Sequence, residues 1–200
     1  RIISEFAGEM RALLDRTARG GKPRWLCVRI PAVLELHPPL GIDVAELARR
    51  GVDMFNLSMN YYTIQHGLDL AAIRALAPAA SVYQELTHVT MVGADPGRKG
   101  DSNFYRRATE EQLTTTADLA REQGLDGVSL FNFAYYREYG NASRGPFCEP
   151  PFSLLPRLAS PTAAGRAPGY YFQAPVWRSV YKNKVLLPRK LKPGEKFTWE

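Results

Sequence analysis

The segment SVYQELTHVT, residues 81–90, alternates β-branched and aromatic residues with polar ones, as a β-strand does. It carries a carboxylate, Glu85, in its middle and a histidine, His88, near its end. An ionised side chain inside a strand of a buried sheet is costly unless it is paired or used in chemistry. Glu85 is therefore the first candidate functional residue of this chain.

Strand-like segments recur on both sides of this one, with helical patterns between them. The predicted strands are 25–31, 53–61, 81–89 and 127–135. The predicted helices are 4–19, 44–50, 69–77 and 109–123, the last opened by a capping box. Strands that alternate with helices, mostly at a period of roughly 28 residues, indicate βαβ units and a parallel sheet.

The remaining segments differ from this pattern. We expect a polar loop at 93–102 and a short helical turn at 152–158. In residues 180–199 Val, Leu, Phe and Lys are mixed around prolines, which indicates the start of a separate β-rich module. With the boundary at Ser179, residues 1–179 form the α/β part and residues 180–200 begin a second domain.

Polar residues inside the strands distinguish between two kinds of parallel sheet. Each predicted strand has a polar side, which carries Arg29, Asn56, Glu85 or Asn132. We expect these four polar sides to form one common face of the sheet. A doubly wound sheet is covered by helices on both faces, so neither face suits such a row. In a (β/α)8 TIM barrel the inward face converges on the axis, where polar strand ends form the active site. We therefore predict an α/β fold that is part of a TIM barrel.

Four βα units are half of a barrel, and an open half would expose both edge strands and its inner face. We expect this half to be completed by a missing N-terminal half of the barrel or by a homo-oligomer partner. The first residue, Arg1 rather than Met, fits the first alternative. Secreted and periplasmic locations both stay open.

Composition narrows the classes of partner and cofactor. The net charge of +6 comes mostly from residues 178–200, where seven basic residues stand against two acidic ones, so a nucleic-acid site is not expected. No apolar run approaches the roughly 20 residues of a membrane helix. Cys27 and Cys148 lie in unrelated contexts, so no disulfide, metal or other cofactor is expected.

Several candidate residues keep two interpretations. Glu85 is either a reactive carboxylate or the partner of Arg29 in a structural ion pair. His88, of opposite strand parity, is a base or a loop residue. Asn56 and Asn132 bind ligand or hold the scaffold, and the tyrosines that follow strands, Tyr61 and Tyr135 among them, stack on sugar rings or pack.

Several segments of the sequence resemble segments of a known protein family. The segments CVRIP (27–31), GIDVAELARRGVDMFNLS (41–58), REQGLDGVSLFNFAYY (121–136) and LPRLASPTAAGRAPGYYF (155–172), with the Glu85 strand, resemble glycoside-hydrolase-like TIM-barrel proteins of bacterial polysaccharide-related gene sets. VLLPRKLKPGE (185–195) resembles the start of the β-sandwich that follows the barrel in such proteins.

The resemblance implies that the four strands are the last four of eight, with a carbohydrate as the ligand. Glu85 would then occupy the place of the nucleophile of retaining glycosidases, whose acid/base carboxylate comes from a strand outside this sequence. Arg29 and Asn56 would orient Glu85, Asn132 would bind sugar hydroxyls, and Tyr61 and Tyr135 would form walls. The alternative is a non-catalytic carbohydrate-binding or scaffold protein. A doubly wound domain with an anionic cofactor is disfavoured, because no Gly-rich phosphate loop follows any strand.

Overall fold

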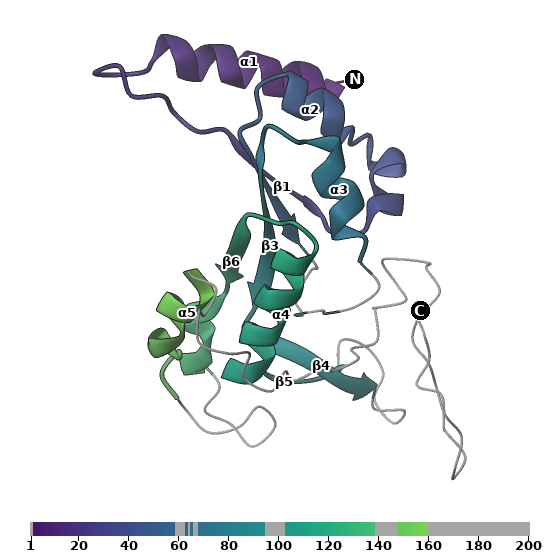
Figure 1. The fold of residues 1–200 in the computed structure, drawn as a ribbon, viewed down its shortest axis with the longest axis vertical. Helices are drawn as coiled ribbons and strands as arrows, with labels where there is room; N and C mark the ends of the chain where they lie inside the picture. The colour runs from purple at the N-terminus through teal and green to yellow at the C-terminus, as the bar shows by residue number, and fades with distance from the viewer. Residues whose placement is uncertain are drawn as a thin grey trace.

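A computed structural model describes residues 2–58, 63, 65, 68–94, 103–138 and 148–159 of the chain. Its centre is a four-stranded sheet in the order β1-β2-β3-β6, and all three neighbouring pairs are parallel. The strands are Cys27–Pro31 (β1), Met54–Ser58 (β2), Ser81–Thr87 (β3) and Gly127–Phe131 (β6). The predicted mixed α/β fold with a parallel sheet is therefore confirmed (Figure 1).

Helices precede or connect the strands, as the alternating pattern predicts. They are Ile2–Arg16 (α1), Val44–Arg49 (α2), Leu70–Leu76 (α3), Glu110–Glu122 (α4) and the short Leu155–Ala159 (α5). Asp43 and Asp69 cap α2 and α3 by accepting backbone N–H groups, and Thr109 with Gln112 forms the predicted capping box of α4. Short 3-10 turns cover Leu34–Leu36, Pro38–Leu40, Phe133–Glu138 and Phe152–Leu154.

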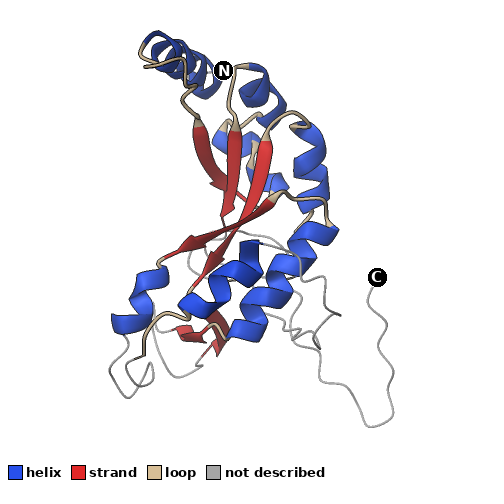
Figure 2. Cartoon of the chain, turned by 60° about the vertical axis from the view of Figure 1, so that its left-hand side comes forward, coloured by secondary structure: helices blue, strands red, loops and turns tan. Residues whose placement is uncertain are grey.

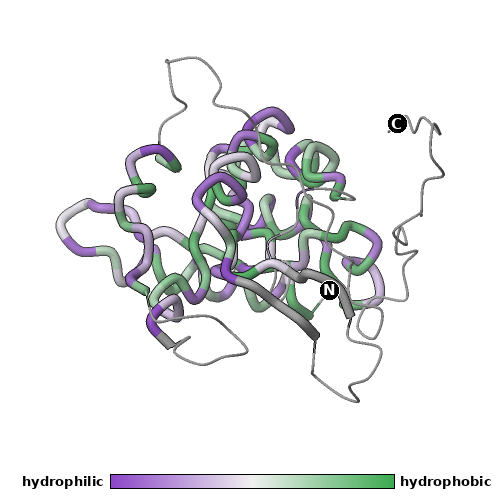
Figure 3. The backbone as a smooth tube through the Cα atoms, turned by 90° about the horizontal axis from the view of Figure 1, so that it is seen from below, coloured by the Kyte–Doolittle hydropathy of each residue, from purple (hydrophilic) through white to green (hydrophobic). Residues whose placement is uncertain are grey.

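The helices lie along one face of the sheet (Figure 2). Phe55, Leu57 and Val82 on that face are fully buried and pack with Leu47 of α2 and Ile73 of α3. A second cluster joins β3 and β6 to α4 and α5 through Leu86, Leu113, Ala117, Leu154 and Leu158. Hydrophobic stretches accordingly gather between strands and helices, while hydrophilic ones follow the outer turns (Figure 3). This sealed face leaves the opposite face of the sheet for polar groups.

A β-hairpin interrupts the regular alternation after β3. Strands Val89–Ala94 (β4) and Asn103–Arg107 (β5) pair in antiparallel fashion with a register shift between Met91 and Gly93. The prediction of a polar loop at 93–102 was therefore wrong at Gly93 and Ala94, which belong to β4, while 95–102 lie outside the described residues. The hairpin was missed because β3 and β4 are separated by His88 alone, so the two strands appear as one run in the sequence.

The bounds of the predicted strands differ from those in the structure: 25–31 begins at Cys27, and 81–89 gives way to β4 after Thr87. The strand expected at 127–135 ends at Phe131, because Asn132 adopts a left-handed conformation (φ 56°) and a 3-10 turn follows. The strand expected at 53–61 is described to Ser58, and residues 59–62 lie outside the described part. The boundary at Ser179 and the β-rich module at 180–200 lie outside it as well. Within the described ranges, no helix has the length and apolar character that crossing a membrane requires.

Candidate functional site

The polar face of the sheet is assembled by the register of its ladders. Pro31 pairs with Ser58 between β1 and β2, and Glu85 pairs with Ser129 between β3 and β6. Because Leu57 pairs with Gln84, the next residues along, Ser58 and Glu85, are neighbours too. One residue row therefore crosses all four strands with Glu85 in it, and Arg29 and Asn56 belong to an adjacent row on the same face.

Glu85 is the centre of this face. Its side chain is only 2% exposed, yet both carboxylate oxygens are fully bonded. Oε1 accepts from Arg29 Nη2 (2.7 Å) and Ser58 Oγ (2.8 Å), and Oε2 accepts from Arg29 Nε (2.7 Å) and Asn56 Nδ2 (3.1 Å). These are the donors that make burial of an ionised carboxylate tolerable. The burial that makes Glu85 conspicuous in the sequence is thus matched by four hydrogen bonds.

Arg29 forms the two-point ion pair with Glu85 that was one of the two interpretations left open. The planar guanidinium meets both oxygens at once, which fixes its orientation better than a single contact would. Its Cζ also lies 4.6 Å from the ring centroid of Phe131, on the far side of Glu85 in the sheet. Since the Arg29 side chain is 47% exposed, the pair joins a buried anion to a half-exposed cation.

Two hydrogen-bonded contacts on this face, Arg29 to Glu85 and Ser129 to Asn56, pass over an intervening strand. They show that the sheet is curved. Ser129 Oγ on β6 lies 2.6 Å from Asn56 Oδ1 on β2, although β3 runs between them. Strands two positions apart are separated by about 9.5 Å in a flat sheet. A serine and an asparagine are too short to meet across that spacing, so the polar face must be concave.

Ser58 and Ser129 belong to the site but were not among the predicted site residues. Ser58 Oγ donates to Glu85, and Ser129 Oγ donates to the amide oxygen of Asn56. Their positions carried a signal, because each has the strand parity that faces Glu85. Serine is too common in strands for this signal to stand out in the sequence.

The parity assigned to the last strand was wrong. Val128 and Leu130 pack into the hydrophobic clusters, and Ser129 and Phe131 occupy the polar face instead. Asn132 was grouped with Val128 and Leu130 and placed on the polar side, but it follows the strand at the turn, where its carbonyl accepts the Tyr135 N–H (2.9 Å). The error arose because Val128, Leu130 and Phe131 are all apolar. The alternation of polar and apolar residues therefore did not show which side of this strand is buried.

The other predicted site residues form a separate group. His88 lies at the β3–β4 junction, is buried, and its ring meets Tyr135 edge-on at 5.8 Å between centroids. Its carbonyl accepts the N–H of Ala108 (2.9 Å) at the base of the hairpin. Tyr135 is partly exposed, and Tyr61 lies outside the described residues. The structure therefore brings Arg29, Asn56 and Glu85 together and places His88 with Tyr135 beyond the end of β3.

The chemistry open to this face is limited by its composition. Among the described strand residues on the polar face, Glu85 is the sole carboxylate. Burial raises the pKa of the Cys27 thiol on β1, which keeps it protonated and weakly nucleophilic at neutral pH. In the part of the chain that the structure describes, no group of three His, Cys, Asp or Glu side chains could hold a metal ion.

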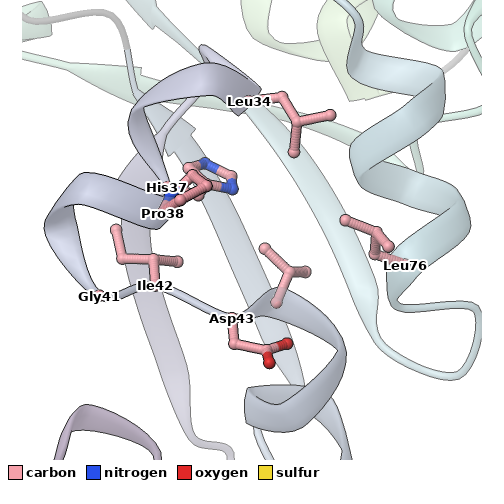
Figure 4. Close-up of a pocket in the computed structure, with 8 residues that line it drawn as sticks. Leu34, His37, Pro38, Gly41, Ile42, Asp43 and Leu76 are labelled. Atoms are coloured by element: carbon pink, nitrogen blue, oxygen red, sulfur yellow. The ribbon is translucent and has the colours of Figure 1, made fainter. Parts of the chain in front are cut away.

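A separate hollow of about 490 Å³ lies on the helical side, between the 3-10 turns after β1 and helices α2 and α3 (Figure 4). It is lined mainly by apolar residues, including Leu34, Ile42 and Leu76. His37 also borders it, but the ring is 3% exposed and Nε2 lies 2.7 Å from the carbonyl oxygen of Pro31. The ring therefore holds the turn against the end of β1, and the carboxylate in the lining, Asp43, is engaged as the N-cap of α2.

Comparison with known proteins leaves the site to be interpreted from its own geometry. No protein-family model matches the sequence, and no curated protein is significantly similar to it.

Proposed function

We propose that this chain is part of a glycoside-hydrolase-like (β/α)8 barrel and that its polar sheet face binds carbohydrate. The observation that carries the proposal is Glu85, an almost fully buried carboxylate near the C-terminal end of a parallel strand, fixed by Arg29. Helices on one face and a concave polar opposite face are the arrangement of a barrel wall. The family resemblance of the sequence supports the same fold.

The groups on this face suit a sugar. Arg29, Asn56 and Ser58 supply hydrogen-bonding groups beside Glu85, and sugar hydroxyls can both donate and accept. Tyr83 and Phe131 share the face and are only partly buried, so their rings are open to the apolar C–H faces of a pyranose. Polar groups that converge on an aromatic surface are typical of small-ligand sites.

In the hydrolase form of this proposal, Glu85 is the nucleophile. The Arg29 guanidinium favours the ionised carboxylate that attack on an anomeric carbon requires. One oxygen must exchange a hydrogen bond for the substrate, and the rotatable hydroxyl of Ser58 is the neutral donor that can turn away. The acid/base carboxylate comes from outside the described residues, at about 5 Å from Glu85 for a retaining enzyme.

The second candidate is a non-catalytic carbohydrate-binding or scaffold protein. The observation in its favour is that each oxygen of Glu85 already accepts two hydrogen bonds, which is the full capacity of a carboxylate. An anion so fully bonded is a weak nucleophile, because every lone pair is engaged. In this form Glu85 and Arg29 organise the face, and the sugar contacts Arg29 and the rings around it.

Both forms require the sheet to continue beyond its edges. Within the described part of the chain, the far side of β1 has no neighbouring strand. The α1 residues Ile2 and Phe6 and the nearby Trp25 are exposed, and a hollow of about 360 Å³ separates Phe6 from Ile30 of β1. We propose that further strands, from an N-terminal half of the barrel or from a second copy, cover this edge.

The Glu85→Gln variant of the intact protein distinguishes the two forms. Turnover and binding are measured on a panel of polysaccharides and aryl glycosides, with Glu9→Gln on the exposed surface of α1 as the matched control. A nucleophile predicts a loss of turnover of about 10⁴-fold with binding retained. Unchanged turnover excludes Glu85 as nucleophile, and absence of binding by the unaltered protein to every glycan contradicts the carbohydrate function.

A further inference from the structure

The hydrogen bonds on the polar face form a directed chain across three strands. Ser129 Oγ on β6 lies 2.6 Å from Asn56 Oδ1 on β2, and Asn56 Nδ2 lies 3.1 Å from Glu85 Oε2 on β3. Ser129 is the register partner of Glu85 on the neighbouring strand, but its hydroxyl donates to Asn56, and Asn56 in turn donates to Glu85. We propose that Ser129 is a positioning residue, which locks the Asn56 amide so that its NH2 group stays on Glu85.

The direction of this chain follows from the chemistry of its end. An ionised carboxylate only accepts, so it requires the NH2 end of Asn56 to face it. The amide oxygen then points the other way, and only a donor can satisfy it there. An asparagine amide has nearly the same shape when turned by half a rotation, so its orientation is set by its partners. The Glu85 carboxylate penalises the turned state, in which the amide oxygen would face it, and the Ser129 hydroxyl holds the other end of the amide in place by donating to Oδ1.

The surroundings of Glu85 explain why the loss of a single neutral hydrogen-bond donor should have a measurable effect on its carboxylate. Arg29 from β1 is the charged group that faces it, Tyr83 is the titratable neighbour on its own strand face, and β6 contributes Ser129 and Phe131. Helices α2 to α4 pack against the opposite face, so their charges do not meet this carboxylate. Loss of the Asn56 bond from a side chain that is 2% exposed is not replaced freely by water.

The experiment reads the carboxyl group itself rather than an activity. The ¹³C chemical shift of the Glu85 side-chain carboxyl is followed by NMR in the intact protein, for the unaltered protein and for Ser129→Ala, Ser129→Thr and Ser81→Ala. Ser81 is the matched control, because it lies on the same face of β3 at the far end of the strand. The ¹H–¹⁵N signals of the Asn56 NH2 group give a second measurement.

We expect Ser129→Ala to shift the ¹³C signal of the Glu85 carboxyl, since one of its donors is held less firmly. The Asn56 NH2 signals should shift and exchange faster in that variant. Ser129→Thr keeps the hydroxyl and should restore both values, and Ser81→Ala should change neither. An unchanged Glu85 carboxyl signal with unchanged Asn56 signals in Ser129→Ala overturns the inference, as does a Thr variant that behaves like the Ala variant.

The positioning role of Ser129 does not depend on the proposed function, and only its effect on turnover or sugar binding rests on that function. The positioning role and the carbohydrate function can therefore fail separately. If Ser129→Ala leaves the Glu85 carboxyl signal and the Asn56 signals unchanged, the positioning role fails whatever the glycan panel shows. If those values move and the protein binds no glycan, the positioning role stands and the carbohydrate function fails.

Discussion

The two faces of the four-stranded sheet are stabilised by different kinds of interaction. On the helical face, Phe55, Leu57 and Val82 are completely buried against α2 and α3, and their packing needs no particular partner atom. On the polar face, Glu85 depends on donors at defined distances from β1 and β2. The stability of the helical face therefore depends on the apolar area that it buries, whereas that of the polar face depends on single donor atoms at defined positions.

The two faces also differ in what burial costs. Apolar groups gain free energy when they leave water, whereas a buried carboxylate loses its hydration and regains it only through its partners. The Arg29–Glu85 pair is therefore weak evidence for stability by itself. Its presence at a concave, half-exposed surface is better explained by a need for a fixed charge at that place.

The largest effect expected is on the helical face. Phe55→Ala removes a fully buried ring between the sheet and two helices, and should lower the free energy of unfolding by about 3–5 kcal/mol. Chemical denaturation followed by circular dichroism measures this, with Leu76→Ala, which removes a partly exposed side chain, as the control. A loss below that of Leu76→Ala would show that this face is not the main source of stability.

A smaller and asymmetric effect is expected on the polar face. Arg29→Leu leaves the buried Glu85 anion without its cation and should cost about 3 kcal/mol, whereas Glu85→Gln leaves a half-exposed Arg29 and should cost about 1 kcal/mol. The double variant Arg29→Leu with Glu85→Gln should recover most of the loss, because it leaves no buried charge without a partner. A denaturation-based double-mutant cycle tests this, and equal costs for the two single variants would contradict the asymmetry.

The smallest effect is expected on the outer surface of the helices. The hydrogen bond from Arg50 to Glu46 on α2 holds the pKa of the Glu46 carboxyl below its usual value. Because this pKa is lowered in the folded state, the contribution to stability is present above the unfolded pKa and is lost as the pH falls through the folded value. Glu46→Gln should therefore make the free energy of unfolding depend slightly less on pH between neutral and acidic pH. A curve of unfolding free energy against pH that matches the curve of the unaltered protein would show that the pair contributes nothing.

The sequence was most informative where local chemistry acts alone. The capping residues Asp43, Asp69 and Thr109 mark helix starts, and those starts agree with the structure. The alternation around Glu85 placed it on the same side as Arg29 and Asn56, as the hydrogen bonds confirm. The hairpin after β3 was missed, because only His88 separates β3 from β4 and the two strands appear as one run in the sequence.

Residue types and their spacing thus determined the order of helices and strands, the parallel sheet and the polar parity of Glu85. Tertiary structure alone decided which donors reach the carboxylate. Arg29 and Ser129 act across an intervening strand, and this depends on sheet curvature, which no local pattern encodes. It also decided that Phe131, not Asn132, faces the site, because the strand ends where the backbone turns. Periodicity assigns a side to each residue, but only the assembled sheet brings those sides within hydrogen-bonding distance.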